Sequence, residues 1–552
     1  MAAVAPTASA PRNLSPGLIS ANLWVAIGAF LLAIVLGLYQ TAERSGLFAW
    51  LESAELYFAS TSTHGVLMAF VLTTFFNMGF GFYVAATSLN RPLWNVKLAW
   101  WSFWIALAGV VLAAYTLLTG QASVMYTFYP PQIAHSLFYL GLVLVVAGSW
   151  VWCLQMLMCY RGWKRANPGQ PVPLAMYGVT ANTILWIWTS IGVATEVLFQ
   201  LLPLSLGIID TIDVGLARTL FAWTLHPIVY FWLFPAYIAM YTMLPKIAGG
   251  RLFSDEMARI AFIMLMVISL PIGFHHLYMD PFLAPGWKLL HAFGTFMVVL
   301  PTLLTGFTVI ASLEIAGRLH GGTGLFGWIG ALPWRKPMMT AAGLALLMLT
   351  IGGFGGLVNA SYAMNAMVHN TAWVTGHFHL IFGGSVVIMY FAIAYCLWPK
   401  LVGKSFKSSK PLLWQLWLWF IGMLVLTIPW HLLGLLGQPR RISTSVYDSP
   451  LVQQWQPMAM WMVIGGVILT LSALLFAWNL VLGWRGGAEA HDPAGATQYA
   501  EPVHPVVRLP RLLNGFAFWN WVILVYLIAS YGYPILQFFL IGSQESVPWS
   551  VL

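Results

Sequence analysis

The sequence predicts an all-α, polytopic membrane protein with about 13 transmembrane helices. The chain has 552 residues, of which 60% are hydrophobic and only 7% are charged, a composition outside the range of soluble globular domains. A bilayer core takes about 20 apolar residues of helix, and thirteen stretches satisfy that length. In chain order they are 24–39, 64–87, 98–118, 133–160, 175–202, 216–244, 260–278, 289–316, 338–357, 373–398, 412–436, 458–482 and 516–541.

Basic residues alternate in density from loop to loop, which supports this set of helices. Of the 24 Lys and Arg residues, all but five fall on the side that holds the N-terminus. Basic loops face the cytoplasm, so the sequence predicts a cytoplasmic N-terminus and an external C-terminus. The net charge of +9 then reflects membrane topology and gives no reason to expect nucleic acid as a partner. The five basic residues on the external side are Arg44, Arg218, Lys288, Arg440 and Arg441.

We expect one membrane-embedded domain over residues 1–552. It includes a cytoplasmic N-terminal segment (1–20) and a polar cytoplasmic linker (486–510) before the last helix. The first 20 residues contain no long apolar core, so no cleaved signal peptide is expected. Cys153, Cys159 and Cys396 lie in apolar stretches without a CxxC or Cys/His pattern. They are expected to be packing residues, and neither disulfides nor thiolate metal sites are indicated.

Histidines near the external face are the main indication of chemistry. With the orientation above, six of the 13 histidines share one depth, within or at the ends of the predicted helices. A single buried histidine is often only a packing residue, but ionisable groups inside a membrane are functional candidates, and a His-His pair and a His-x-His triplet strengthen that interpretation. The six are His64, His226, His275, His276, His377 and His379.

The spacing of these residues indicates more than one metal. His377 and His379 are two residues apart on a helix of 3.6 residues per turn, so their imidazoles point to nearly opposite faces. One helix can therefore bind two different cofactors. Imidazole is a common ligand of haem iron and copper, and a set of three histidines beyond those that bind haem suits a copper ion.

A phenol and a proline accompany one of the histidines. His226 and Tyr230 are four residues apart, which puts both side chains on one helix face. Pro227 lacks an N–H, so it favours a helix bent towards a cofactor. The same face continues through Tyr237 and Tyr241 towards the cytoplasm.

Other hydroxyl groups extend this stripe. Thr302 and Thr305 lie at mid-depth on the eighth predicted helix, and Ser254 lies in a cytoplasmic loop. Hydroxyls both donate and accept hydrogen bonds, as a proton relay requires. The alternative is that these residues only pack and bond to their own backbone. Their direction towards the histidines favours a relay.

The motifs resemble those of the haem-copper oxidases. The motifs that show this resemblance are the run from His226 to Trp232 (HPIVYFW), the pair His275-His276 after Gly273-Phe274, and Gly376-His377-Phe378-His379. Ile228 stands where the mitochondrial-type A family has a glutamate, so the chain resembles the B family of bacterial and archaeal enzymes, the ba-type group. The resemblance covers nearly the whole chain and implies the fold of subunit I, the catalytic subunit.

Carried over to this sequence, the resemblance implies three metal sites. His64 and His379 would bind a low-spin haem b, and His377 would bind the iron of a high-spin haem, for which an a-type haem is expected. Copper B would be held by His226, His275 and His276, with Tyr230 covalently joined to His226.

The resemblance also implies roles for residues that do not bind a metal but contact haem propionates or carry protons. Arg440 and Arg441 would hold haem propionates, and His369 would lie near a propionate of the high-spin haem. Tyr237, Tyr241, Ser254, Thr302 and Thr305 would form the single proton-uptake route. Asn365 is a departure from the family, because the best-known B-family members carry an aspartate there. A possible proton acceptor is thereby lost.

The implied function is a terminal respiratory oxidase in the plasma membrane of a bacterium or archaeon. It would reduce dioxygen to water with four electrons, take protons from the cytoplasm and translocate further protons. The chain has no Cys/His cluster for a dinuclear copper centre. A copper A subunit (subunit II) would therefore deliver electrons from a c-type cytochrome.

Three alternatives remain open on the sequence alone. A nitric oxide reductase of the same superfamily carries non-haem iron and typically a glutamate near it. Tyr230 argues against that enzyme, and no glutamate lies on the metal-bearing faces of the sixth and seventh predicted helices, while Glu196 in the fifth has no assigned role. A quinol oxidase differs only in its electron donor. A transporter explains the helices but not the six histidines.

Overall fold

The computed structural model describes residues 13–47, 53–444, 448–486, 488–489 and 499–540. Within them, twelve helical segments are long and apolar enough to cross a membrane. Helices are expected here because each backbone polar group in a bilayer must be satisfied within its own segment. The membrane-spanning segments are α1 (Pro16–Arg44); α2 (Ala54–Val66), η2 (Leu67–Leu72) and α3 (Thr73–Ser88); α4 (Val96–Leu118); α5 (Ser136–Ala166); α6 (Leu174–Glu196), η3 (Val197–Leu201) and α7 (Leu202–Ser205); α8 (Val214–Leu225), α9 (Pro227–Thr242) and α10 (Leu244–Ile247); α12 (Pro285–Met297) and α13 (Val299–Leu319); α15 (Pro337–Ala360); α17 (Ala372–Phe378), η5 (His379–Val386) and α18 (Val387–Val402); α19 (Lys410–Leu435); α21 (Gln456–Gly486); and α22 (Ala517–Leu527), η6 (Ile528–Gly532) and α23 (Tyr533–Leu540).

The remaining predicted crossing is interrupted. The sequence predicts a continuous helix over 260–278, but α11 (Asp255–Ile268) ends after 14 residues and a short 3₁₀ helix, η4 (Gly273–Leu277), follows. Pro271 lies between them and cannot continue a helix. The prediction of an all-α membrane protein is confirmed, and this broken segment explains why twelve long helices are found where about 13 were predicted.

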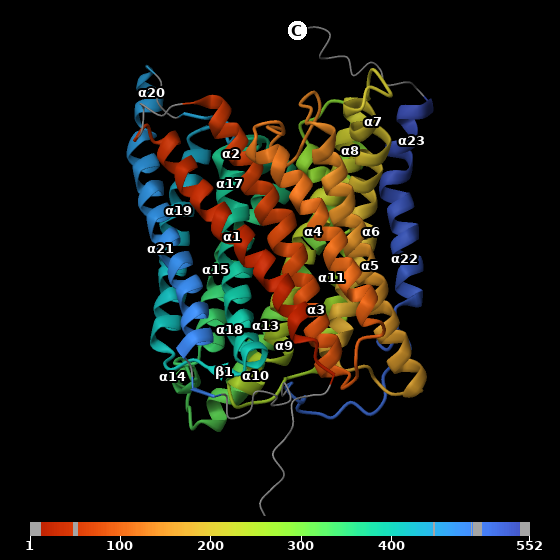
Figure 1. Cartoon of the computed structure of the whole chain (residues 1–552), viewed down its shortest axis with the longest axis vertical. Coiled ribbons are helices and arrows are strands. Elements are labelled where there is room, and N and C mark those ends of the chain that lie inside the picture. The colour runs from red at the N-terminus through yellow and green to blue at the C-terminus, as the bar shows by residue number, and fades with distance from the viewer. Residues whose placement is uncertain (1–12, 48–52, 445–447, 487, 490–498, 541–552) are drawn as a thin grey trace, which may run out of the picture.

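Short elements lie at the two ends of the helix bundle. Figure 1 shows α7, α8, α17 and α20 at one end, and α10, α14 and β1 at the other. Lys246 and Lys404 belong to that second group, on the side where the sequence is rich in basic residues. The short elements outside the spans are α14 (Gly327–Ala331), α16 (Tyr362–Val368), α20 (Pro450–Gln453), β1 (Lys404–Ser405) and β2 (Ala488–Glu489), the last two forming an antiparallel pair.

The spans differ strongly in how far they are covered by other helices. Ala54–Ser88, Val214–Ile247 and Ala372–Val402 are 89%, 94% and 89% buried in their most apolar windows, whereas Ala517–Leu540 is only 28% buried. The three buried spans form the centre of the bundle and the others surround them. The central spans are those that carry His64, His226 and the His377/His379 pair.

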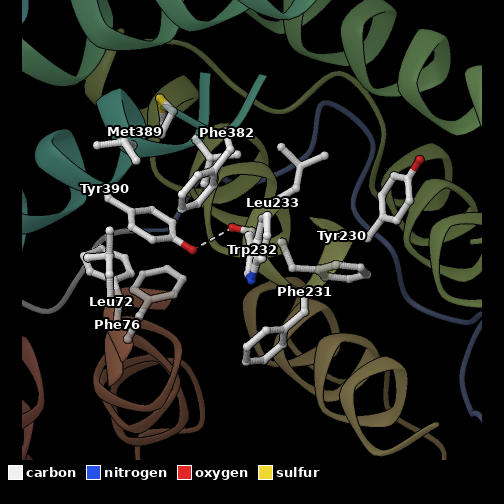
Figure 2. Packing of buried hydrophobic residues seen from close by; sticks show 14 of the residues in the cluster. Leu72, Phe76, Tyr230, Phe231, Trp232, Leu233, Phe382, Met389 and Tyr390 are labelled. Carbon is white, nitrogen blue, oxygen red and sulfur yellow. Dashed lines mark hydrogen bonds between the residues drawn. The ribbon is translucent and has the colours of Figure 1, made fainter. Parts of the chain in front are cut away.

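Aromatic residues join the central spans to one another. Tyr390 of α18 stacks on Phe76 of α3 with ring centroids 3.8 Å apart, and its hydroxyl donates to the carbonyl of Trp232 on α9 at 2.7 Å. Figure 2 shows this cluster, with Tyr230 pointing away from it. The side of α9 that carries Tyr230 therefore takes no part in this aromatic packing.

The segments expected at the cytoplasmic face are described in part. Residues 1–12 of the N-terminal segment, and 487 and 490–498 of the linker, lie outside the described residues. The rest of the linker is attached to the bundle: Leu252 N–H donates to the carbonyl of Glu501, and the hydroxyls of Thr87 and Tyr499 are 2.7 Å apart.

Candidate metal centre

Three histidines from two separate segments form a compact cluster. One ring nitrogen from each of His226, His275 and His276 lies within 4.8 Å of the others. The ring centroids are 4.5 Å apart for His226–His275 and 4.1 Å for His275–His276. Such a group of neutral imidazoles is a suitable ligand set for copper or another transition metal.

Local breaks in the helices bring these side chains together. α8 ends at Leu225 and α9 begins at Pro227, so His226 lies at the interruption, as Pro227 led us to expect. His275 and His276 lie in η4, after the early end of α11. Nδ1 of His275 donates to the Ile272 carbonyl at 2.7 Å, and Nε2 of His276 is buried without a partner among the described residues.

Tyr230 lies one helical turn from His226, as predicted. Its hydroxyl is 3.1 Å from Nε2 of His226, and the two ring centroids are 5.1 Å apart. Because Nε2 faces the phenol, Nδ1 of His226 is the ring nitrogen left for a metal ion. The phenol is thus held beside the three-histidine cluster.

His64 and His379 form a second arrangement, with nearly parallel rings. Their centroids are 6.2 Å apart at an interplanar angle of 22°. With metal–imidazole bonds of about 2.0 Å and roughly 1.1 Å from nitrogen to ring centre, two axial imidazoles on one ion have centres about 6.2 Å apart. The pair therefore fits a metal held between two axial histidines, as in a low-spin haem.

Backbone carbonyls fix the orientation of these rings. Nδ1 of His64 donates to Ala33 at 2.7 Å, and Nδ1 of His379 donates to Thr375 at 2.8 Å. A carbonyl oxygen can only accept, so Nδ1 carries the proton and Nε2 presents its lone pair. Metal-binding histidines are commonly oriented in this way.

His377 points to the other side of the chain from His379. Its Nδ1 donates to the Gly352 carbonyl of α15 at 3.0 Å. Glycine is needed beside this ring, because a Cβ at Gly355 would lie 3.0 Å from Nδ1 and one at Gly356 would lie 3.3 Å from Cε1. His377 therefore has the same tautomer as the pair above, with Nε2 free for a metal.

One cavity of about 730 Å³ connects all of these groups. All six histidines and Tyr230 line it, while no Asp or Glu of the described residues does. Part of its wall is apolar and lies between α13 and α15, where Leu303, Phe307 and Phe354 contribute. Long, largely apolar space with imidazoles at fixed positions fits haem groups better than a small polar ligand.

The residues predicted for propionates lie along the outer edge of this cavity. Arg440, Arg441 and His369 all line it. Arg441 donates to the hydroxyl of Thr127 at 3.2 Å, and Nδ1 of His369 donates to Oδ1 of Asn365 at 3.0 Å. Burial and the neighbouring arginines lower the pKa of His369 to about 4.

An ion pair in the same region was missed by the sequence reasoning. Arg218 contacts Asp280 at 2.9 Å, and its guanidinium lies over the ring of Tyr129 at 4.9 Å. Burial raises the pKa of Asp280 to about 6, despite the opposing effect of Arg218 and Lys288. The available signal was the rarity of cations on this side, since Arg218 and Lys288 are two of the five.

Two further intramembrane histidines were also missed. His291 is fully buried in α12, where Nδ1 accepts from the N–H of Phe274 at 3.1 Å. It thereby supports the segment that carries His275. His431 of α19 lies against Gly376, where a Cβ would be 2.8 Å from Nδ1. Both fall inside predicted helices, so their position in the sequence was a sufficient signal.

The predicted proton-route residues are brought together only in part. The hydroxyl of Tyr241 donates to Thr305 at 2.8 Å, while Tyr237 has a buried hydroxyl without a partner among the described residues. Thr302 lines the cavity and donates to the Val298 carbonyl at 3.4 Å. Ser254 caps α11 by accepting from the N–H of Met257 at 3.2 Å. A continuous line of direct hydrogen bonds is therefore not formed by the five side chains.

Comparisons with known proteins agree with this geometry. Residues 18–468 match the family model described as "Cytochrome C and Quinol oxidase polypeptide I". The chain is 40% identical over 543 residues to cytochrome c oxidase subunit 1 of Thermus thermophilus, covering 96% of each chain. It is 27% identical to that subunit of Thermostichus vulcanus, covering 84% of this chain and 83% of the relative. A heme-copper terminal oxidase dimer solved by cryo-electron microscopy superposes with a TM-score of 0.89 and 38% identity, covering 95% of this chain and 93% of that one.

Proposed function

Because the chain belongs to the cytochrome c and quinol oxidase polypeptide I family, as a haem-copper oxidase catalytic subunit, we propose that it reduces dioxygen to water at a centre of high-spin haem and copper B. One observation carries the proposal. The cavity that holds the His226/His275/His276 cluster is also lined by His64 and His379, whose nearly parallel rings have centroids 6.2 Å apart and would hold a haem iron. A transporter without redox cofactors does not require this combination of metal-binding histidines.

We assign the six histidines as follows. His64 and His379 bind a low-spin haem b, and His377 binds the iron of the high-spin haem. The remaining three bind copper B through the ligand atoms that lie within 4.8 Å of one another. The assignment is supported by the Nδ1 hydrogen bonds of His64, His377 and His379, which leave Nε2 available to iron.

When bound, these groups supply the electron transfer and the dioxygen chemistry. The contribution of the protein is to hold and move protons beside them. The hydroxyl of Tyr230, 3.1 Å from His226, is placed to give up a proton and an electron when the O–O bond is split. The proposed covalent link between the two side chains would fix this contact.

The apolar side of the cavity supports an a-type high-spin haem. Such a haem carries a long apolar tail, and the wall formed by Leu303, Phe307 and Phe354 has matching chemistry. A tail between α13 and α15 would be covered by apolar side chains. Haem extraction and mass spectrometry identify the type directly.

Arg440, Arg441 and His369 are proposed to hold propionates at the outer edge. Proton uptake is proposed to follow Ser254, Thr305, Tyr241, Tyr237 and Thr302 towards Tyr230. The direct bond between Tyr241 and Thr305 supports this route, and water molecules are required to bridge the remaining steps. Asn365 accepts a hydrogen bond from His369 and cannot itself take a proton at neutral pH, so proton translocation would use another acceptor.

Electron entry requires a partner. Cys153 and Cys159 are buried and Cys396 is half-buried, and none belongs to the three-histidine cluster. We propose a copper A subunit on the external face, with a c-type cytochrome as donor. The chain is proposed to be a single membrane-embedded domain in a bacterial or archaeal plasma membrane, with a cytoplasmic N-terminus, so that electrons and protons enter from opposite sides.

The nitric oxide reductase alternative is disfavoured by the cavity. Glu196 is fully buried on α6 with both carboxylate oxygens unpartnered among the described residues, but it does not line the cavity. The deciding experiment is a pyridine haemochrome spectrum with metal analysis of the purified complex. We expect two haem irons and one copper per catalytic chain, before the coppers of the partner are counted. Non-haem iron without copper would favour the reductase.

A further inference from the structure

Arg44 is a buried cation that forms no ion pair with any carboxylate of the described residues. It ends α1 and is 4% exposed. Its Nη2 donates to Oε1 of Gln438 at 2.9 Å, whereas its Nε has no hydrogen-bond partner in the part of the chain that the structure describes. A buried charge is costly unless it is paired, so an anion from outside the chain is indicated.

The position of Arg44 identifies where that anion lies. Arg44 lines the central cavity together with Gln40, Tyr57 and His64, so it belongs to the side of His64. Its partner Gln438 lies two residues before Arg440 and connects this side to the proposed propionate edge.

The other arginines at this edge are placed differently. Arg218 is paired with Asp280, and Arg441 reaches Thr127 with its guanidinium 5.7 Å from the ring of Tyr129. Arg44 makes none of these contacts. Arg44 is therefore a cationic position separate from the arginines near His369.

The charges around the cavity are unbalanced without a ligand. Arg44, Arg440 and Arg441 line it, and Arg218 lies over the ring of Tyr129, another lining residue. Asp280, which pairs with Arg218, is the one described carboxylate that is paired with any of these four arginines. No Asp or Glu among the described residues lines the cavity. Each haem carries two propionate carboxylates, so two haems bring the negative charge that these side chains lack.

We propose that Arg44 binds a propionate carboxylate of the low-spin haem, as a third cation beside Arg440 and Arg441. This inference rests on the proposed function, since it assumes that His64 and His379 hold that haem. A cation at a propionate stabilises the reduced form of the haem, because reduction adds negative charge nearby. Arg44 thus raises the midpoint potential of the haem that receives electrons first.

The test is a spectroelectrochemical titration of the low-spin haem in the purified complex. Arg44→Gln removes the charge and keeps an amide, Arg44→Lys keeps the charge, and Arg318→Gln is the control. Arg318 is exposed, is bonded to Glu314 and is not among the residues that line the cavity. We expect a more negative midpoint potential in Arg44→Gln, a smaller shift in Arg44→Lys and none in Arg318→Gln. Haem content is measured on the same samples.

The outcomes separate this inference from the proposed function. Loss of the low-spin haem in Arg44→Gln but not in Arg44→Lys also supports charge-dependent binding. Loss of haem in both variants shows a packing role and overturns the inference. Two bound haems with an unchanged potential in Arg44→Gln overturn it while leaving the proposed function intact, whereas a wild-type complex without haem overturns both.

Discussion

Replacement of Gly355 by alanine should weaken the binding of the high-spin haem. The added Cβ would lie 3.0 Å from Nδ1 of His377 and 3.5 Å from its Cβ and Cγ. The ring must then shift and strain the 3.0 Å bond from Nδ1 to the Gly352 carbonyl. Loss of such an orienting bond typically costs 10- to 100-fold in metal affinity, or about 1.4 to 2.7 kcal/mol.

The same substitution has an opposing effect on the helix. Alanine in place of glycine stabilises a helix interior by about 0.5–1 kcal/mol, but this gain is shared by the folded protein with and without haem, so the expected loss of haem affinity stays at about 1.4 to 2.7 kcal/mol. Gly28→Ala is the matched control, because Gly28 also lies in a membrane-spanning helix and its Cβ would meet nothing within 4 Å.

The assay is the carbon monoxide difference spectrum, which reports the high-spin haem, together with total haem and oxygen consumption. Gly355→Ala should lose carbon monoxide-binding haem on prolonged detergent incubation while the low-spin haem stays. Gly28→Ala should behave as the wild type. Equal retention of carbon monoxide-binding haem in both variants would refute the reasoning that the room left by Gly355 and the bond to Gly352 hold His377 in its haem-binding orientation.

Three further predictions follow from individual contacts. Tyr241→Phe removes a proton-route hydroxyl and should lower oxygen consumption about 10- to 100-fold with unchanged haem spectra; an unchanged rate would exclude Tyr241 from the route. Burial raises the pKa of Asp280 to about 6 from 3.8, so the folded state binds this proton more tightly than the unfolded state. Its contribution to stability is then fully present below pH 3.8 and is lost as the pH rises through 6. Asp280→Asn should make the thermal unfolding temperature less dependent on pH over that range, although it also removes the charge that pairs with Arg218. An identical pH profile would contradict the shift. The peptide containing His226 and Tyr230 should be lighter by two hydrogen atoms in mass spectrometry if the covalent link forms, and an unmodified mass would exclude it.

The motifs allowed the family to be recognised from the sequence, and the comparisons confirm it. The membrane-spanning architecture is also confirmed, because long apolar stretches can only be helices or closed barrels in a bilayer. Ile228 in the HPIVYFW run already indicated the B family. What the sequence could not provide was the local backbone at the histidines.

The region before His64 shows one reason. The second helix was predicted to begin at His64, but α2 begins at Ala54. Ser60 and Thr61 lower the hydropathy of this turn, although both hydroxyls donate to the carbonyl of Tyr57 within the helix. Polar residues satisfied in this way can lie inside a membrane helix, and a hydropathy window does not detect them.

Helix breaks and unpaired charges show a second reason why the local structure does not follow from the sequence. After the interruption at Pro271, His275 and His276 lie on a 3₁₀ turn, and His291 packs against Phe274 of that turn at 3.9 Å between ring centroids. Arg44 could be recognised from the sequence only as a rare external cation. Its burial beside the cavity results from contacts between residues nearly 400 positions apart, and such contacts are set by tertiary packing.

The copper content of the His226→Ala variant tests the central claim most directly. If three imidazoles hold one copper beside two histidine-bound haems, the purified variant should retain both haem irons per chain and lose the single copper, together with oxygen consumption. Full copper content with undiminished oxygen consumption would contradict the assignment of His226, His275 and His276 as one metal site.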